Sequence, residues 1–404
     1  METIRVELLI AGGGLAGMTL ALACAGAGVE TALIDRESPE RMLAAPFDGR
    51  TTALAWGSAR VMDTLGLWGD LAGEAEPIRE IRVADGGSRL HLHYDQSLIG
   101  DHALGFIVEN RMLRRALYQR LRRERSLAYL APVAVESVAR NSEGVSATLS
   151  DGRSMQAQLV AACDGFASPL REAAGIKSFA WSYPQTGIVA TVRHEEPHRG
   201  IAVEHFLPAG PFAILPMSRQ RSSIVWTERS DLAPSLLALD ERRFHAELAR
   251  RFGDHLGALE IEGPRWSYPL SFLFARRVSA PRLALVGEAA HAIHPIAGQG
   301  FNLGVRDVAA LAELVVDRRR LGLDLGGAAL LADYEERRRI DAALLAGVTD
   351  GLNRLFSNDV APVRLVRDLG LAAVDRMVPL KRLFMRHAMG VAGDAPRLVR
   401  GEAL

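Results

Sequence analysis

Cysteine is almost absent from this sequence, which has Cys24 and Cys163 among its 404 residues. Neither has the spacing of a zinc site, and two cysteines make no disulfide framework. His91 and His93 fall on one face of an expected strand, as two metal ligands would, but no third ligand is apparent nearby. The sequence therefore predicts a reduced, cytoplasmic protein without a metal site.

The sequence also has no excess of positive or negative charge. Lys and Arg total 48, as do Asp and Glu, which argues against nucleic-acid binding by the chain as a whole. No apolar run reaches the roughly 18 residues of a membrane-spanning helix. Residues 8–27 are apolar like a secretory signal, but Glu2 and Glu7 stand where basic residues are expected. The remaining composition, 49% apolar and 24% charged, is that of a soluble globular protein of about two to three domains.

A glycine-rich turn follows the first expected strand, RVELLI, and precedes a helix of small residues over 18–27. Gly12 permits the tight turn, Gly14 lets the backbone approach a pyrophosphate, and Gly17 allows the helix to pack closely on the strand. The second strand, TALID, ends in Asp35, at the offset where a carboxylate accepts from a ribose hydroxyl. These features predict dinucleotide binding and leave FAD and NAD(P) as alternatives.

Two later segments repeat the pattern of a strand, a glycine and a helix. In LVAACDGFASPLR a strand runs into Asp164 and Gly165 before helix-start residues. In VGEAAHAIHPIAGQGFNLG, Gly298 and Gly300 precede a segment of helical periodicity. A helix N-terminus with free N–H groups is a seat for an anion, although a tight strand-to-helix connection would look the same.

Periodicity predicts an α/β fold with a Rossmann-like domain, an inserted and mostly antiparallel sheet domain, and a helical C-terminal region. Residues 1–70, 101–177 and 276–360 are assigned to the first domain and residues 71–100 and 178–275 to the second. We expect helices over 51–67, 110–123, 241–251 and 330–355, a hairpin over 81–94, and strands at GIVATVRH, PFAILPM and SSIVWTE.

The last segment, 361–404, is basic and expected to be helical. Residues 361–400 carry eight Lys or Arg against three Asp or Glu, a net charge of +5. Within them VPLKRLFMRHAMG alternates apolar and basic side chains. Such a segment either lies on an anionic membrane surface or packs on its own protein, and the sequence favours neither alternative.

The order of these signatures resembles the group A flavoprotein monooxygenases, which have the para-hydroxybenzoate hydroxylase fold. Within that group the chain looks like the ubiquinone-biosynthesis hydroxylases of the UbiH/UbiF/VisC family. The likeness runs nearly end to end, and its more specific stretches are HPIAGQGFNLGVRD, YEERRRIDAALLAGVTDGLNRLFSND and YPQTGIVATVRHEEPHRGIAVEHFLPAGPFAILPM.

The resemblance implies FAD as the bound dinucleotide, NAD(P)H as a transient donor and O2 as co-substrate. It implies a flavin-ring loop of Pro295, Gly298, Gln299 and Gly300, without an assigned acid or base. His291 and His294 are as typical of turn-stabilising residues as of catalysts. Glu288 departs from the family, which usually has Asp there. The cofactor-binding residues implied are Gly12, Gly14, Leu15, Ala16, Gly17, Asp35, Arg36, Arg50, Arg111, Asp164, Gly165, Gly287, Glu288, Gly298, Gly300, Phe301 and Asn302.

The function implied is FAD-dependent hydroxylation of a polyprenylated phenol or quinone precursor in ubiquinone biosynthesis. Other biosynthetic proteins and the inner membrane surface are further partners under this reading, and nucleic acid and metal are not. Two alternatives keep the fold: a flavin-dependent monooxygenase, halogenase or reductase acting on another aromatic or isoprenoid substrate, and a flavin-binding scaffold. The missing W-x-W-x-I-P arrangement argues against a halogenase, and the intact glycines argue against a scaffold.

Overall fold

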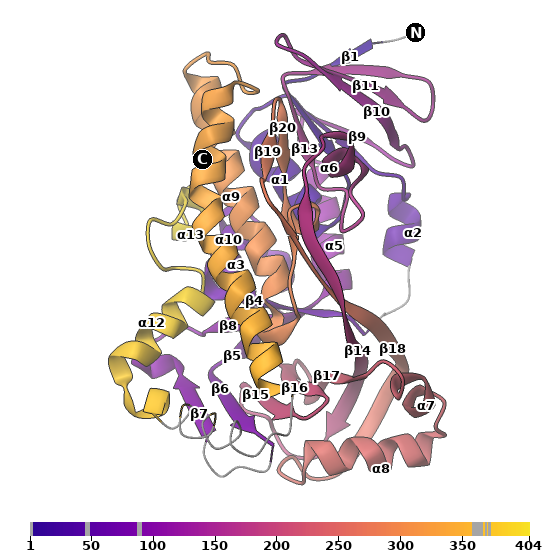
Figure 1. The fold of residues 1–404 in the computed structure, drawn as a ribbon, viewed down its shortest axis with the longest axis vertical. Coiled ribbons are helices and arrows are strands. Elements are labelled where there is room, and N and C mark those ends of the chain that lie inside the picture. Colours follow the sequence, from indigo (N-terminus) through magenta and orange to yellow (C-terminus); the bar gives the residue numbers. More distant parts are fainter. Residues whose placement is uncertain (1–2, 45–48, 87–90, 358–366, 368–369, 371–372) are drawn as a thin grey trace.

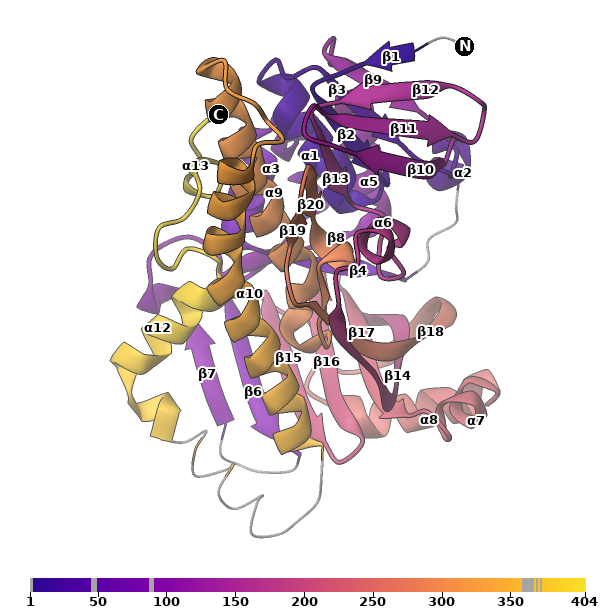
Figure 2. The ribbon, with the colours of Figure 1, turned by 45° about the horizontal axis from the view of Figure 1, so that its top comes forward.

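The structure is a computed structural model that describes residues 3–44, 49–86, 91–357, 367, 370 and 373–404. An α/β unit forms one end of the molecule and a large sheet forms the other, with long helices running along one side of both (Figures 1 and 2). The predicted mixed α/β architecture is confirmed.

The core of the α/β unit is a six-stranded sheet. Its order is β19 (Ser279–Ala280), β20 (Leu283–Leu285), β13 (Leu159–Ala162), β2 (Leu8–Ala11), β3 (Thr31–Ile34) and β9 (Leu127–Leu130). All of its pairs except β19 with β20 are parallel. Every residue of β2, β3 and β13 is buried, as expected for parallel strands covered on both faces. Helix α1 (Leu15–Gly26) packs against both α5 (Asn110–Leu121) and α9 (Gln299–Arg320).

Two smaller sheets complete this unit. One has the order β1 (Thr3–Arg5), β12 (Ser154–Ala157), β11 (Val145–Leu149) and β10 (Val135–Arg140), and the other the order β4 (Thr51–Ala55), β8 (Gly105–Glu109) and β5 (Glu76–Ile78). The short helices of this unit are α2 (Pro39–Ala44), α3 (Trp56–Thr64), α4 (Trp68–Leu71) and α6 (Pro169–Ala173).

Two of the expected elements are wrong in detail. The strand RVELLI is two strands in two sheets, because β1 pairs with β12 whereas β2 pairs with β13. The helix expected over 51–67 begins only at Trp56. Residues Thr51–Ala55 form β4, and their apolar and β-branched side chains pair with β8 across the sheet.

The large sheet has the order β21 (His291–Ala292), β18 (Leu259–Ala275), β14 (Ser178–His194), β17 (Arg221–Arg229), β16 (Gly210–Met217), β15 (Ile201–Leu207), β6 (Glu80–Asp85) and β7 (His91–Asp95). The three predicted strands lie in β14, β16 and β17, and β6 pairs antiparallel with β7 as the predicted hairpin requires. Residues 87–90 of that hairpin lie outside the described residues. The sheet packs one face on α8 (Glu241–Phe252), through a core that includes Trp226, Phe212 and Phe244.

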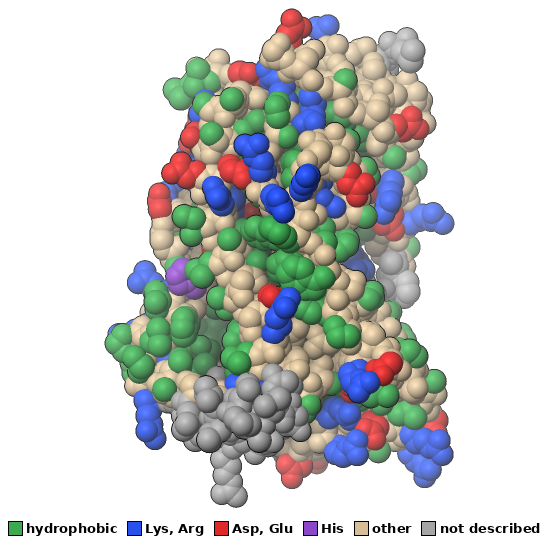
Figure 3. Space-filling view, viewed as in Figure 1, with side chains coloured by type: hydrophobic (Ala, Val, Ile, Leu, Met, Phe, Trp, Pro, Cys, Tyr) green, Lys and Arg blue, Asp and Glu red, His purple; other side chains and the backbone are tan. Residues whose placement is uncertain are grey.

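The C-terminal part is helical. Helix α10 (Ala328–Phe356), predicted over 330–355, follows a glycine-containing break after α9, and α12 (Val378–Ala388) and α13 (Arg397–Arg400) follow it. Hydrophobic side chains gather on the surface over α12 and over the middle of α10 (Figure 3). Within the described residues, no helix is long and apolar enough to cross a membrane. Residues 361–366, 368–369 and 371–372 of the predicted basic segment lie outside this description.

The division into domains stays a prediction. Strands β6 and β7 of residues 71–100 belong to the large sheet, whereas β5 of the same range pairs with β8. The remaining short elements are α7 (Ala233–Leu237), η1 (Gln96–Leu98), η2 (Gly287–Ala289) and η3 (Ile296–Gly298).

Candidate functional site

The turn between β2 and α1 contains glycines with different neighbours. Gly12 has φ +106°, and a Cβ placed there would lie 2.3 Å from the carbonyl oxygen of Cys163. At Gly17 a Cβ would lie 1.9 Å from the carbonyl oxygen of Gly12. At Gly14, the N-cap of α1, a Cβ would meet nothing within 4 Å, and no side chain caps the helix. The protein itself therefore excludes side chains at Gly12 and Gly17, while Gly14 opens the helix N-terminus to a ligand.

Asp35 lies at the end of β3, beside this turn. Its Oδ2 accepts a hydrogen bond from the N–H of Gly13 at 2.7 Å, and its Oδ1 accepts from the N–H of Glu37 at 2.8 Å. A carboxylate has about four acceptor positions, so a ribose hydroxyl can still bind. Arg36 is exposed next to it, and Leu15 and Ala16 are half-buried in the first turn of α1.

The second junction, at Asp164 and Gly165, follows β13. The carbonyl group of Cys163, the first residue after β13, lies against Gly12. Asp164 accepts a hydrogen bond from the N–H of Leu170 at 3.2 Å through Oδ2. Its Oδ1 is buried and has no hydrogen-bond partner within the described residues. Burial raises the pKa of Asp164, against the opposing effect of hydrogen bonds from Ser168 and Leu170. An unsatisfied carboxyl oxygen beside a glycine of φ +85° fits a polar ligand group.

Gly287 joins the third segment to the first. A Cβ on Gly287 would lie 3.3 Å from the Cβ of Ala16, and a Cβ on Gly304 would lie 3.3 Å from the Cα of Gly287. The N-terminal turns of α1 and α9 therefore meet at Gly287, which has φ +64°. Glu288, where the family usually has Asp, is exposed.

The loop before α9 is held against β4. Gly298, the N-cap of α9, has φ +61°, and a Cβ there would lie 2.8 Å from the Cβ of Ala53. Asn302 is fully buried: its Oδ1 accepts from the N–H of Ala55 at 2.9 Å, and its Nδ2 donates to the carbonyls of Ala53 and Gly298 at 2.7 and 3.1 Å. Because these hydrogen bonds go to protein backbone, Asn302 fixes the loop in position.

The other residues expected around the flavin ring differ in exposure. Pro295 and Gly300 are exposed, and a Cβ on Gly300 would meet nothing within 4 Å. No side chain caps α9, so its first N–H groups are available. Gln299 is buried and its Nε2 donates to the carbonyl of Ala388, at 3.4 Å, at the end of α12. Phe301 is half-buried and packs on the main core.

Arg50 and Arg111 are brought together, at the starts of β4 and α5. The N–H of Asn110 donates to the carbonyl of Arg50 at 3.0 Å. The exposed Arg50 guanidinium lies 5.7 Å from the ring centre of Tyr268. Arg111 Nε lies 2.5 Å from a carboxylate oxygen of Glu109. The contact of either arginine with a cofactor stays a prediction.

A buried ion group beneath the α9 turn was not predicted. Asp307 is 1% exposed; one of its oxygens lies 2.7 Å from His291 Nε2 and accepts from the N–H of Gly287 at 3.0 Å. The other oxygen lies 2.6 Å from Nε of Arg338 on α10. Burial alone would raise the pKa of Asp307, but the charges of His291 and Arg338 outweigh it and lower that pKa. The aspartate of GVRD was the available signal, although nothing in the sequence identifies its partners.

His294 differs from His291. Its ring is fully buried, and neither ring nitrogen has a hydrogen-bond partner within the described residues. Burial lowers the pKa of His294 to about 4, against the attraction of Asp350. The ring packs edge-on against Tyr183, at 5.2 Å between centres, and the Tyr183 hydroxyl donates to Asp350 at 2.7 Å. His294 is therefore neutral near pH 7.

The sequence showed no third metal ligand near His91 and His93, and the structure groups His93, without His91, with two carboxylates. Ligand atoms of Glu80, His93 and Asp95 lie within 4.8 Å of one another. However, Glu80 forms an ion pair with Arg82 at 2.8 Å, and Asp95 accepts from the N–H of Ser97 at 2.8 Å. These partners account for both carboxylates without an ion.

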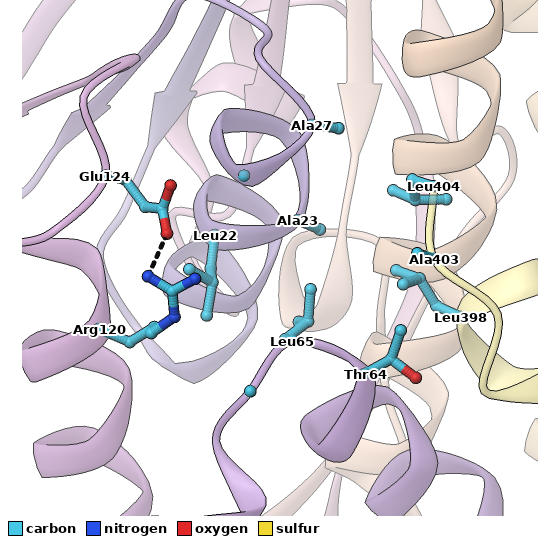
Figure 4. Close-up of a pocket in the computed structure, with 12 residues that line it drawn as sticks. Leu22, Ala23, Ala27, Thr64, Leu65, Arg120, Glu124, Leu398, Ala403 and Leu404 are labelled. Carbon is cyan, nitrogen blue, oxygen red and sulfur yellow. Dashed lines mark ion pairs between the residues drawn. The ribbon is translucent and has the colours of Figure 1, made fainter.

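A cavity of about 210 Å³ lies elsewhere, between the C-terminal half of α1, the end of α5 and the last residues of the chain (Figure 4). Arg120 and Glu124 form an ion pair at one side of it, at 2.5 Å. This cavity is separate from the glycine-containing turns before α1 and α9.

The geometry of those two turns and of the Asp164–Gly165 junction fits FAD. They combine two uncapped helix N-termini, open space at Gly14 and Gly300, and an Asp164 oxygen without a hydrogen-bond partner within the described residues.

Comparison with known proteins gives the same picture. Residues 5–346 match the FAD binding domain family. The chain is 57% identical over 401 residues to ubiquinone hydroxylase UbiL of Rhodospirillum rubrum, covering 98% of this chain and 93% of that protein. It is 32% identical to 3-demethoxyubiquinol 3-hydroxylase of Escherichia coli, covering 97% of this chain and all of that protein (100%).

Solved structures agree at the level of the fold. The p-nitrophenol 4-monooxygenase PnpA of Pseudomonas putida superposes with a TM-score of 0.80 at 20% identity, over 98% of this chain and 100% of that chain. The probable FAD-dependent monooxygenase pqsL of Pseudomonas aeruginosa gives 0.76 at 23% identity, over 91% and 99% of the two chains.

Proposed function

Because the chain belongs to the FAD-dependent ubiquinone-biosynthesis hydroxylases, we propose that it inserts one oxygen atom from O2 into the ring of a polyprenylated phenol. The observation that carries this proposal is the meeting of the N-terminal turns of α1 and α9 at Gly287. It offers seats for both ends of one FAD: Gly12, Gly14 and Gly17 at the pyrophosphate, and Gly298 to Gly300 at the flavin ring.

The residues of this chain bind and orient the cofactor, and FAD supplies the activation of oxygen when bound. N–H groups at the start of α9 would stabilise negative charge on a flavin ring bound there. Asn302 and the Asp307 ion group hold that helix start against β4 and η2, so the N–H groups are fixed before charge develops. NAD(P)H as transient electron donor completes the reaction.

The substrate assignment is supported by the names of the relatives and by the apolar surroundings of the loop. UbiL is named a ubiquinone hydroxylase, and the Escherichia coli relative a 3-demethoxyubiquinol 3-hydroxylase. Ile296, in the loop before α9, packs with Phe206 of the large sheet and Phe356 of α10. An apolar wall at this place suits an aromatic ring with a prenyl chain.

The membrane surface is part of the proposal, because a long prenyl chain resides in lipid. Helix α12 exposes Leu383 and Phe384 on the side away from the protein, with Met377 and Val378 before them. Its cations and apolar side chains form the combination that binds anionic lipid.

The test is biochemical and genetic. We expect the purified protein to be yellow, its reduced flavin to be reoxidised by air, and a strain without the gene to accumulate a quinone precursor lacking one hydroxyl group. A colourless protein that cannot be reconstituted with FAD contradicts the cofactor assignment. A normal ubiquinone profile, in a strain without a second hydroxylase, contradicts the substrate assignment.

A further inference from the structure

Strand β15 turns alternate side chains toward the loop before α9. Ala202, Glu204 and Phe206 are buried, whereas the residues between them face the other side of the sheet. Ala202 packs in the cluster that contains Met385 and Met389 at α12. Phe206 packs with Ile296 of the flavin-ring loop and stacks on Phe356 at 4.2 Å. Glu204 lies between them and therefore faces the region between that loop and α12.

The surroundings of the Glu204 carboxyl are apolar. Its cross-strand neighbours are Val83 on β6 and Ala213 on β16, and its neighbours on the same face are Ala202 and Phe206. The side chain is buried, and within the described residues its carboxyl has no hydrogen bond or ion pair.

The other buried carboxyls of this sheet have partners. Asp85 pairs with Arg367 at 2.8 Å, and Glu228 lies 3.6 Å from Arg251 and accepts from the N–H of Arg229 at 3.0 Å. Lys381 of α12 is paired with Asp375 at 2.8 Å. Among the described residues, no basic side chain forms an ion pair with Glu204.

A carboxyl in such a place is stable as the neutral acid, because ionised carboxylates are costly to bury without a partner. Accordingly, burial raises the pKa of Glu204 to about 8. A neutral carboxyl offers one donor and one acceptor. Glu204 keeps 9% of its surface exposed, so its unpaired carboxyl can be reached by a ligand on the face toward the candidate site, and it is a candidate ligand contact.

We propose that Glu204 binds substrate, by hydrogen-bonding through its carboxyl to the oxygen substituent of the aromatic ring. The prenyl chain of such a substrate contributes binding affinity but does not fix the orientation of the aromatic ring. One hydrogen bond from the sheet would select which ring carbon faces the flavin-ring loop. This role rests on the proposed function, since it requires an oxygenated aromatic ring at this site.

The test compares two ligands that differ in one oxygen. The holoenzyme is titrated with 2-geranylphenol and with geranylbenzene, and binding is followed by the change in the flavin absorbance spectrum. We expect the wild type to prefer the phenol about tenfold, which corresponds to 1.4 kcal/mol. Glu204→Leu should abolish the preference, and Glu204→Gln should keep most of it, because an amide also donates and accepts.

Glu260→Leu is the matched control, since Glu260 is exposed on β18 of the same sheet. It should bind both ligands like the wild type. If Glu204→Leu does not accumulate with FAD, Glu204→Met makes the same comparison with a more adaptable apolar side chain.

The possible failures are distinguishable. A wild type that binds FAD but neither ligand contradicts the proposed function, and the role of Glu204 falls with it. A wild type that binds both ligands equally, or a Glu204→Leu variant that keeps the tenfold preference, overturns the role of Glu204 alone. A preference kept by Glu204→Leu would mean that the Glu204 carboxyl hydrogen-bonds to water and not to the substrate.

Discussion

At the scale of single residues, Gly14 and Gly17 belong to one turn but differ in what excludes a side chain. A Cβ at Gly17 would lie 1.9 Å from the carbonyl of Gly12, whereas at Gly14 it would meet no protein atom within 4 Å. We expect Gly14→Ala to fold normally but to bind FAD at least about tenfold more weakly, because the methyl group holds the pyrophosphate away from the N–H groups. Flavin content after dialysis measures this.

Gly17→Ala is the comparison variant. It should lower the melting temperature of the apoprotein as well, because α1 must move away from the turn of β2. Equal melting temperatures for the two apo variants, with equal flavin content, would contradict the distinction between the two glycines.

Glu204 predicts a pH dependence of stability. Burial raises its pKa from an ordinary value of 4.5 to about 8 in the folded protein. The folded state then binds the extra proton between these pH values, so this group costs stability as pH rises from 4.5 to about 8, and its cost is constant above that. We expect Glu204→Gln to gain stability relative to the wild type over this window, on the order of 3 kcal/mol.

The measurement is urea unfolding of both proteins at pH 5 and pH 8.5. Any cost of burying the amide is independent of pH, so the change in the difference is the readout. Curves that keep a constant separation would mean that Glu204 is ionised in the folded protein.

The backbone roles of the glycines were easier to predict from the sequence than the hydrogen-bond partners of the polar residues. Glycine spacing reflects local backbone geometry, which neighbouring residues reveal. Asn302 was expected at the cofactor, which stays a prediction, and the sequence did not indicate that its side chain binds the backbone of Ala53, Ala55 and Gly298. Asp307 was not singled out, since its partners lie on other elements and its burial depends on packing that periodicity does not specify.

At the scale of elements, Asp307 connects three of them: η2 through Gly287, β21 through His291 and α10 through Arg338. Asp307→Asn removes the negative charge between two buried basic groups. We expect a loss of about 3–5 kcal/mol in the free energy of unfolding at pH 7, together with weaker FAD binding. Chemical unfolding and flavin content measure the two effects.

The pH dependence has a definite sign here too. The folded-state pKa of Asp307 is lowered, so its stabilisation is present above the unfolded pKa and is lost as pH falls through the folded value. The difference between variant and wild type should therefore shrink in acid. Asp333→Asn on α10 is the control, because Asp333 is half exposed and its pair with Arg318 should contribute less than about 1 kcal/mol.

Long elements were predictable and short ones were not. The helix expected over 330–355 is observed as Ala328–Phe356, because its apolar face repeats over many turns. The expected helix over 51–67 was wrong at its start. Its first five residues fit both a helical and a strand pattern of apolar side chains. They form a strand because they pair with β8, which is distant in the sequence.

At the scale of the whole molecule, the basic tail has features of both sequence alternatives. Helix α12 packs on its own protein, since Met385 and Met389 are buried and Lys381 is paired with Asp375. Its outer side remains exposed, with Leu383 and Phe384 half exposed. Packing and lipid contact are therefore compatible, because they use different sides of one helix.

This arrangement decides how membrane binding should be tested. Deleting residues 361–400 would also remove Leu398 and Val399, which are buried in the main core. Point variants avoid that damage. We expect the wild type to float with vesicles containing anionic phosphatidylglycerol, and the double variant Leu383→Ser, Phe384→Ser to lose most of this binding, because exposed apolar area drives insertion at the interface.

The control moves the same change to another exposed apolar surface: Ile340→Ser with Leu344→Ser on α10. It should float like the wild type if α12 is the contact. Arg376→Gln with Arg386→Gln should weaken binding about thirtyfold and remove much of its salt dependence, since each cation near an anionic surface contributes about 1 kcal/mol. Equal flotation of all variants would place the lipid contact elsewhere. Loss of flotation in the α10 control alone would place the lipid contact on α10. The prenyl chain would then have to reach Glu204 and the flavin-ring loop from that side.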